Sequence, residues 1–207
     1  MAVPKTGTTS VQKYLLANDK TATINRVELN GKHYKFREHM TALEIKNVLV
    51  VNYQNFTIIG FVRHPYGRIV SSYFFYKKGA KSCVWVGKES KKPTEQKLKI
   101  KLAQLLPFHI WALVYPYKSN IEYFFDTKNI LIVDIKNIGL FEDLEENLNE
   151  ILSRSNICLE KEIPHENKSL HLGEDEYFKN PVFKWLINRK VKRDLEFYNL
   201  VLSRKQL

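Results

Sequence analysis

Near its start the chain reads Pro4-Lys5-Thr6-Gly7-Thr8-Thr9-Ser10. A run with an apolar face that predicts a helix, Val11-Gln12-Lys13-Tyr14-Leu15-Leu16, follows it directly. A glycine-containing turn that opens a helix points backbone N–H groups at one place, where the helix dipole also favours negative charge. The lysine and the four hydroxyl groups add further donors. The pattern predicts a site for a phosphate or a sulfate. The alternative is a plain polar turn in which Thr9 or Ser10 caps the helix.

The stretch differs from the Walker A loop of nucleotide-binding proteins. That loop requires a lysine directly after its second glycine, whereas Lys5 precedes the only glycine of this stretch, Gly7. The sequence also offers no clear carboxylate for a magnesium ion. A P-loop-like kinase or nucleotide hydrolase is therefore a less favoured alternative.

A second motif begins where a buried strand is expected to end. Residues 56–62 are apolar and rich in β-branched side chains, which predicts a strand. Pro65 suits the first position of a helix, which we expect over residues 65–77. Arg63 would then lie at the carboxyl end of the strand, where open α/β sheets bind ligands. Its guanidinium offers a bidentate fork to a phosphate, and Ser71 can add one hydrogen bond.

Together, the two motifs resemble those of PAPS-dependent sulfotransferases. The family's 5′-phosphosulfate loop is matched by residues 4–10. Its 3′-phosphate motif, R-x-P-x-x-R-x-x-S-x-Y, is matched by Arg63, Pro65, Arg68, Ser71 and Tyr73. The motifs are most similar to those of the carbohydrate branch (heparan 2-O and chondroitin 4-O type), which includes short bacterial and viral relatives. Weaker matches are Glu38-His39-Met40-Thr41-Ala42, Phe141-Glu142-Asp143-Leu144 and Pro164-His165-Glu166-Asn167-Lys168-Ser169.

The resemblance implies which residues bind the cofactor PAPS, whose product is PAP, with no metal ion. They are Lys5, Thr6, Gly7, Thr8, Thr9, Ser10, Arg63 and Ser71. Lys5 would also stabilise the bridging oxygen while the sulfuryl group moves in line to a hydroxyl of the acceptor, which is expected to be a glycan. His39 would be the general base, because related carbohydrate enzymes place a histidine in the matching segment and a histidine titrates near neutral pH. Glu38 is the rival base.

For several residues near the motifs, the sequence is compatible with more than one role. Arg68 suits a structural ion pair as well as the cofactor, and Tyr73 suits the core as well as the adenine. His64 is expected to point away from the phosphate. An ordinary loop is the favoured reading for His165, Asn167 and Lys168. A solvated loop explains the following lysines at least as well as glycan binding does: Lys77, Lys78, Lys81, Lys88, Lys91 and Lys92.

Composition points to one globular domain over residues 1–207. The chain is 44% hydrophobic and 13% aromatic, which argues against disorder. Its net charge of +11 implies an anionic partner or a lysine-rich proteome. Nucleic acid is disfavoured as that partner, because it would require aromatic residues interleaved with the basic ones, and Trp85 is the only aromatic residue in the basic loop over residues 78–97. A non-catalytic anion-binding module is a further alternative, which the intact Lys5, Arg63 and Ser71 oppose.

Processing and redox signals are weak in this chain. Cys83 and Cys158 form neither a disulfide framework nor a metal cluster. No apolar run reaches about 18 residues and no signal peptide precedes the loop, so we expect no membrane span and a cytoplasmic location. Three residues precede Pro4, so the strand expected before the loop is either very short or truncated. The sequence leaves the oligomeric state open.

Alternating strands and helices predict an α/β fold. The resemblance makes it a P-loop-like three-layer fold with a central parallel sheet flanked by helices. Further expected elements are a helix over residues 10–18, a hairpin turn at Asn30-Gly31, a helix over 41–47 capped by Thr41, a helix over 95–106 that Pro107 ends, a strand over 130–134, and amphipathic helices over 140–152 and 181–202.

Overall fold

The structure is a computed structural model that describes residues 1–79, 94–155, 157 and 173–204. These residues group into two compact units. Unit 1 comprises Met1–His64, Ser119–Glu166 and Arg193–Leu207. Unit 2 comprises Pro65–Lys118 and Asn167–Lys192.

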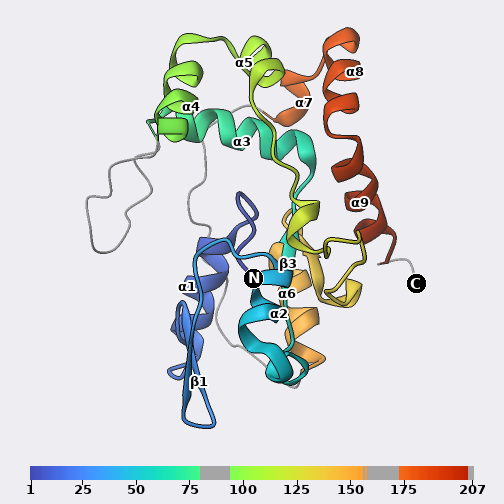
Figure 1. The fold of residues 1–207 in the computed structure, drawn as a ribbon. Coiled ribbons are helices and arrows are strands. Elements are labelled where there is room, and N and C mark those ends of the chain that lie inside the picture. Colours follow the sequence, from blue (N-terminus) through green and yellow to red (C-terminus); the bar gives the residue numbers. More distant parts are fainter. Residues whose placement is uncertain (80–93, 156, 158–172, 205–207) are drawn as a thin grey trace. The chain divides into compact units, whose positions relative to one another are not determined.

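Unit 1 is built around two short parallel strands (Figure 1). Strand β3 (Gly60–Val62) pairs with β4 (Ile138–Leu140), and the ladder continues where the Phe141 N–H donates to the Val62 carbonyl at 2.7 Å. The other elements of this unit are α1 (Thr8–Asn18), β1 (Arg26–Leu29), β2 (Lys32–Lys35), α2 (Ala42–Leu49), α6 (Leu144–Ser153), α9 (Lys192–Ser203) and the 3₁₀ helices η1 (Val50–Asn55), η2 (Ile121–Tyr123) and η3 (Ile135–Asn137).

The two strands separate two hydrophobic clusters, because neighbouring side chains along a strand point to opposite faces. On one face, Phe61 packs with Tyr14 of α1 and with Leu148 and Leu152 of α6. On the other face, the cluster is formed by Val3, Ala42, Val62, Ile121, Tyr123, Phe124, Val133, Ile138, Leu140, Phe197 and Val201. Unit 1 therefore has helices on both sides of a parallel pair. Within the described residues, each sheet contains two strands.

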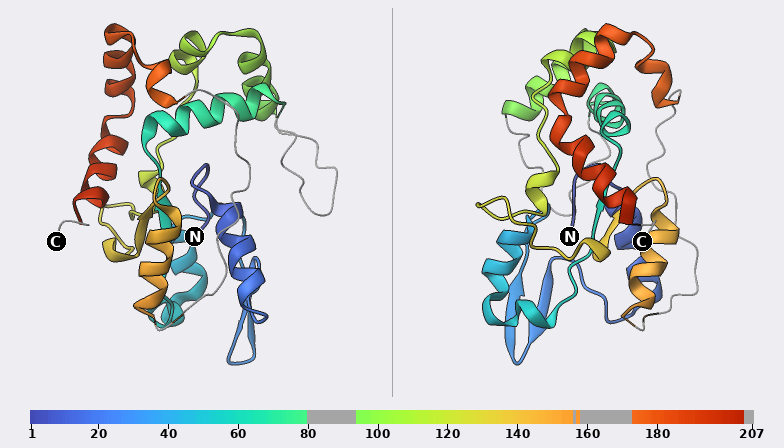
Figure 2. Two further views of the ribbon diagram at one scale, coloured as in Figure 1. Left: turned by 180° about the vertical axis from the view of Figure 1, so that it is seen from behind. Right: turned by 90° about the vertical axis from the view of Figure 1, so that its right-hand side faces the viewer.

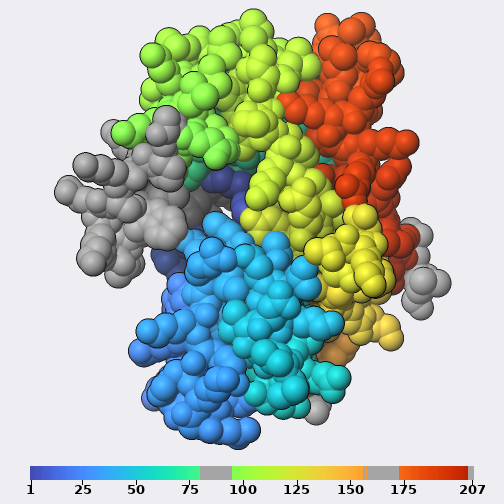
Figure 3. Space-filling model, in the orientation of Figure 1, coloured from blue at the N-terminus to red at the C-terminus, as the bar shows by residue number. Residues whose placement is uncertain are grey.

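Local sequence signals explain the segment before β3. Asn30 and Gly31 both have positive φ angles (51° and 73°), as the predicted hairpin turn between β1 and β2 requires. The predicted cap is also confirmed, because Thr41 and Glu44 form a capping box at the start of α2. Figure 2 shows the hairpin as a narrow arm next to α2, and Figure 3 shows it (blue) against η1 (cyan). There the Asn52 amide donates to the Tyr34 hydroxyl at 2.9 Å.

Two predicted elements were wrong. The strand expected over residues 130–134 is reduced to one antiparallel bridge, between Leu131 and Phe125, and η3 follows it. The carboxylate of Asp126 accepts the N–H groups of Lys128 and Ile130, and that of Asp134 accepts the Lys136 N–H. These local bonds form a tight turn before the bridge and the start of η3 after it, and the parallel strand forms at β4 instead. The single helix expected over 181–202 is divided at Val191 into α8 (Pro181–Lys190) and α9.

Unit 2 is helical and aromatic. Its elements are α3 (Pro65–Lys77), α4 (Thr94–Leu105), α5 (Phe108–Val114), α7 (Glu174–Tyr177) and α8. Tyr73 packs against Phe108 and Trp111, and the Tyr66 ring stacks on Phe178 at 4.2 Å. The Lys190 ammonium donates to the carbonyl groups of Ala112, Leu113 and Tyr115 at the end of α5. Burial lowers the pKa of this lysine.

The helix over residues 65–77 is confirmed as α3. The mixed α/β character is confirmed as well, but the predicted central parallel sheet is not shown: among the residues that the structure describes, the parallel pairing is limited to β3 and β4. Within the described ranges, no helix is sufficiently long and apolar to cross a membrane.

Candidate functional site

The predicted anion-binding loop has an unusual backbone. Lys5 and Gly7 both have positive φ angles, 66° and 74°. The Thr6 and Thr8 hydroxyls both donate to the Val3 carbonyl, at 3.0 and 2.9 Å. Since Val3 is fully buried in the core of unit 1, these bonds tie the loop to a rigid point. Two of the four hydroxyls therefore stabilise the loop itself.

A further contact anchors the start of the loop. The Asn120 side-chain amide donates to the Pro4 carbonyl at 3.3 Å, and the Asn120 backbone N–H donates to the Asp194 carboxylate of α9 at 2.8 Å. Asn120 and Asp194 are both buried. Buried polar pairs of this kind keep one loop conformation, because a shift would leave a desolvated donor without its acceptor.

Helix α1 begins directly after the loop, with Gly7 at its N-cap position. A glycine has no side chain to bond the first turn, and the helix supplies no acceptor for the N–H groups of its first residues, Thr8 to Ser10. These N–H groups lie at the positive end of the helix dipole. Thr9 is exposed and Ser10 is buried. This helix end has the geometry that binds an oxyanion.

Gly7 is also needed for close packing. A Cβ atom at this position would lie 3.0 Å from Cδ2 and Cε2 of Phe141 and 2.9 Å from Cδ2 of Leu144. Phe141 directly follows β4, and Leu144 begins α6. The loop therefore approaches the carboxyl end of β4 as closely as a residue without a side chain permits.

Arg63 lies at the carboxyl end of β3, as the sequence predicts. The centre of its guanidinium, Cζ, stands 4.3 Å from the centroid of the Phe141 ring. A planar guanidinium stacked on an aromatic face keeps its N–H donors in its own plane. The same ring therefore contacts the loop with its edge and supports Arg63 with its face.

The turn after Arg63 is held by Glu142, the residue that follows Phe141. One carboxylate oxygen of Glu142 accepts the His64 N–H at 2.9 Å, and the other accepts the Tyr198 hydroxyl of α9 at 3.3 Å. The His64 and Tyr198 rings meet edge to face at 5.1 Å. The backbone at the end of β3 is thus fixed from a neighbouring strand and from a helix.

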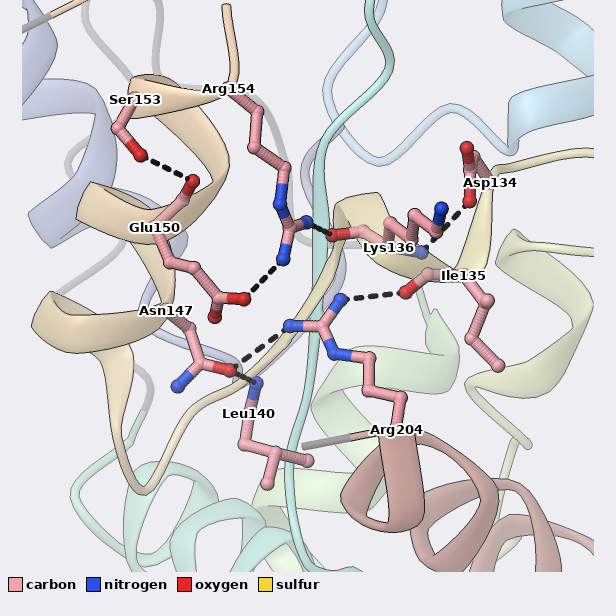
Figure 4. A network of polar contacts seen from close by, with 9 residues as sticks. All are labelled: Asp134, Ile135, Lys136, Leu140, Asn147, Glu150, Ser153, Arg154 and Arg204. Atoms are coloured by element: carbon pink, nitrogen blue, oxygen red, sulfur yellow. Dashed lines mark hydrogen bonds and ion pairs between the residues drawn. The ribbon is translucent and has the colours of Figure 1, made fainter. Parts of the chain in front are cut away.

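The carboxyl end of β4 is itself fixed by a polar network (Figure 4). The Leu140 N–H donates to the Asn147 side chain at 3.2 Å, and Arg204 donates to Asn147 and to the Ile135 carbonyl. Arg154 is held by Glu150 and donates to the Lys136 carbonyl. Burial lowers the pKa of Arg204, which the Glu150 carboxylate opposes. These contacts join α6 and the residue after α9 to η3 before β4 and to Leu140 at its end, which directly precedes Phe141.

His39 is exposed, and a contact with Ala2 attaches it to the start of the chain. Its Nδ1 lies 2.8 Å from the Ala2 carbonyl oxygen, so Nδ1 carries a hydrogen and donates it. In the neutral ring, Nε2 then holds the lone pair. Nε2 stands 3.7 Å from the Glu38 carboxylate. The backbone of His39 has a positive φ of 58°, a conformation that costs free energy and that is often found at functional sites.

The remaining residues of the arginine motif lie on α3 in unit 2. Ser71 is half-buried there. Arg68 is 5% exposed; it donates to the Lys118 carbonyl and its guanidinium covers the Tyr117 ring at 4.2 Å. The Tyr73 hydroxyl donates to the Leu106 carbonyl at 3.0 Å. In this unit, Arg68 and Tyr73 therefore have structural partners.

Other named residues are placed only in part. Lys77 donates to the Tyr73 hydroxyl at 3.1 Å, and Lys78 is exposed. Outside the described residues lie Lys81, Lys88, Lys91, Lys92, His165, Asn167 and Lys168. Sequence reasoning missed the position of Phe141. Its segment was noted as a weak match, but a half-buried aromatic residue after a strand gives no sign of which loop it contacts.

Comparison with known proteins gives one match. The model of the Sulfotransferase family matches residues 1–200, which include the loop, Arg63, Ser71 and His39. None of the curated proteins matches the chain, and none of the solved structures does. Because the family match covers nearly the whole sequence, the chain belongs to the sulfotransferase family.

Proposed function

We propose that this sulfotransferase moves a sulfuryl group from PAPS to a carbohydrate hydroxyl by in-line transfer, with His39 as the general base. The observation that carries the proposal is a pair of contacts. They link the predicted base, His39, and the predicted phosphate ligand, Arg63, to residues 2–7 of unit 1. His39 bonds to Ala2, and Arg63 stacks on the ring that touches Gly7. A phosphosulfate loop, a phosphate-binding arginine and a base then belong to one compact unit.

The loop is the proposed site of the 5′-phosphosulfate. Backbone N–H groups of Thr8, Thr9 and Ser10 would donate to its oxygens, together with the Lys5 ammonium. The hydroxyls of Thr6 and Thr8 already donate to Val3, so we assign these two residues to the shape of the loop and to backbone donation. Arg63 would bind the 3′-phosphate. The hydrogen bond of the Ser71 hydroxyl to the same phosphate remains a prediction from the sequence motif.

The hydrogen bond to Ala2 supports a defined role for each nitrogen of His39. Because Nδ1–H donates to a carbonyl group, Nε2 is the atom that can accept a proton from the acceptor hydroxyl. The Glu38 carboxylate, 3.7 Å from Nε2, would then stabilise the imidazolium that forms. We therefore assign Glu38 as the electrostatic partner of the base.

The proposed reaction is balanced without a further reactant. The acceptor oxygen forms a bond to sulfur while the bond between sulfur and the bridging phosphate oxygen breaks. The acceptor proton moves to Nε2 of His39, and the negative charge that develops on the bridging oxygen is stabilised by Lys5. PAP and the sulfated acceptor leave.

Domain organisation is part of the proposal. The family match spans residues of both units, so we propose that residues 1–207 form one sulfotransferase domain. We assign β3 and β4 to the central sheet of a P-loop-like fold. The Met1 amino group donates to the Ile59 carbonyl at 2.7 Å, which supports Met1–Val3 as a short extended segment beside β3. The net charge of +11 suits an anionic glycan as the acceptor.

Transfer of radiolabelled sulfate from PAPS to a panel of glycans tests the proposal directly. We expect label in at least one glycan with the wild-type chain and none with Lys5→Ala. The exposed Lys13→Ala variant, altered on the neighbouring helix, is the matched control and should retain activity. Label transfer from ATP with magnesium, and none from PAPS, would favour a kinase instead.

A further inference from the structure

Phe141 contacts both of the motifs assigned to the nucleotide. Its ring edge lies against Gly7, where a Cβ atom would be 3.0 Å from Cδ2 and Cε2. Its ring face lies under Arg63, with the guanidinium 4.3 Å from the centroid. One side chain therefore contacts both the loop and the arginine.

The backbone that carries Phe141 is held from two directions. Its own N–H donates to Val62, the residue before Arg63, at 2.7 Å. The preceding N–H, that of Leu140, donates to the buried Asn147 side chain (Figure 4). The ring is thus held in place, and its orientation fixes the position of the stacked guanidinium relative to the loop at Gly7.

We propose that Phe141 is a positioning residue that sets the separation of the two phosphate groups accepted by the site, and thereby its preference for a nucleotide with a 3′-phosphate. The inference rests on the proposed function, because it takes the loop and Arg63 as the two phosphate sites. A flat ring suits this role, since stacking holds the guanidinium by its face and fixes the plane in which its N–H donors lie.

A variant of Leu144 can distinguish a positioning role of Phe141 from a role in packing alone. Leu144 also touches Gly7, with Cδ2 at 2.9 Å from the Cβ position, and it lies in the cluster of α1 and α6. The Arg63 guanidinium stacks on the Phe141 ring. Shortening Leu144 should loosen the loop and leave the support of Arg63 intact. Shortening Phe141 should alter both.

The test compares adenosine 3′,5′-bisphosphate (PAP) with adenosine 5′-monophosphate (AMP), which lacks the 3′-phosphate, by calorimetry. In Phe141→Leu, we expect the ratio of the two affinities to fall on the order of fivefold, and in Phe141→Tyr we expect the wild-type ratio. Leu144→Ala should weaken both nucleotides alike and keep the ratio. In the Arg63→Ala background, Phe141→Leu should leave the ratio unchanged.

The outcomes distinguish this inference from the function on which it rests. Wild-type protein that binds neither nucleotide, or binds both equally, overturns the proposed function and this inference with it. A wild-type preference for PAP that survives in folded Phe141→Leu overturns the inference and leaves the function standing. If Phe141→Leu does not fold, Phe141→Met, which conserves volume but lacks a ring, gives the same comparison; an unchanged ratio there also overturns the inference.

Discussion

Arg63 and Arg68 belong to the same sequence motif, and the structure gives them opposite settings. Arg63 follows β3 in unit 1, is half-buried, and lies with its guanidinium on Phe141. Arg68 lies inside α3 in unit 2, is 5% exposed, and bonds to the Lys118 carbonyl while covering Tyr117. Both are stacked arginines, so stacking does not distinguish them. What differs is whether the side chain reaches solvent.

The difference in burial suggests that Arg63 serves ligand recognition and that Arg68 serves the stability of the fold. A half-buried guanidinium at a strand end can exchange water for a phosphate at little cost. A buried guanidinium that is already bonded would leave a carbonyl group desolvated if it turned to a ligand. We therefore expect substitutions at Arg68 to change the free energy of unfolding, and substitutions at Arg63 to change ligand affinity.

The largest effect is expected from Arg68→Ala. Loss of the buried guanidinium should lower the free energy of unfolding by about 3 kcal/mol, because the Lys118 carbonyl loses its donor and Tyr117 loses its cover. Urea denaturation measures this. The control is Arg189→Ala, since Arg189 is exposed and also stacks in unit 2, on Trp185 at 5.0 Å. A loss below about 0.5 kcal/mol for that control is expected, and an equal loss in both variants would contradict the comparison.

The next effect concerns His39, which is exposed and close to the loop. His39→Ala should lower kcat roughly 10²-fold, because general-base catalysis by Nε2 is lost. PAP affinity should be nearly unchanged. His33→Ala is the control, since His33 is an exposed histidine on β2. Normal turnover in His39→Ala would transfer the role to Glu38 or to an unassisted mechanism.

Arg63→Ala should have a smaller effect, and on binding only. Loss of the charge-assisted contact to the 3′-phosphate should weaken PAP by about 2 kcal/mol, while AMP should be almost indifferent. The free energy of unfolding should change little. Calorimetry with both nucleotides and a urea titration provide the three measurements. Equal weakening of PAP and AMP would mean that Arg63, like Arg68, is structural.

The smallest effect on the free energy of unfolding is expected from the charge of Glu44. Glu44 accepts the Thr41 N–H, which is the main cause of its lowered pKa, and it pairs with Arg37. Because the folded-state pKa is lowered, this contribution is present above the unfolded-state pKa and is lost as the pH falls through the folded-state value. A glutamine still offers an oxygen to the Thr41 N–H but carries no charge, so Glu44→Gln should lower the free energy of unfolding by about 0.5 kcal/mol at pH 7 and by less below pH ~4.

Denaturation of Glu44→Gln and wild type across this pH range checks the sign. A difference that grows on acidification would contradict the assigned role of the Glu44 charge.

Elements with local signals were predictable from the sequence. The Asn30-Gly31 turn, the Thr41 cap and the helix beginning at Pro65 each depend on a few neighbouring residues, and all three are confirmed. The strand at Ile138–Leu140 was not predictable in this way. Its glycine is required by the Phe61 ring, since a Cβ on Gly139 would lie 2.4 Å from Cε1 of Phe61. That contact spans 78 positions along the chain, beyond any local pattern.

The residues of the candidate site were predictable from the sequence, but the contacts between them were not. Lys5, Gly7, Arg63 and His39 follow from motif spacing. The contact of His39 with Ala2, and the placement of the Phe141 ring between Gly7 and Arg63, depend on how β3 and β4 pair. The division of the predicted C-terminal helix at Val191 has a similar cause, because Val191 is 1% exposed and its position is fixed by tertiary packing.

If unit 1 binds a nucleotide that carries both a 5′-phosphosulfate and a 3′-phosphate, PAP should stabilise the fold more than ATP does. Thermal unfolding with PAP, compared with thermal unfolding with ATP and magnesium, measures this. At 100 times its dissociation constant, PAP should raise the free energy of unfolding by about 2.7 kcal/mol, and ATP with magnesium should raise it much less at the same concentration. Equal or greater stabilisation by ATP with magnesium would contradict the account.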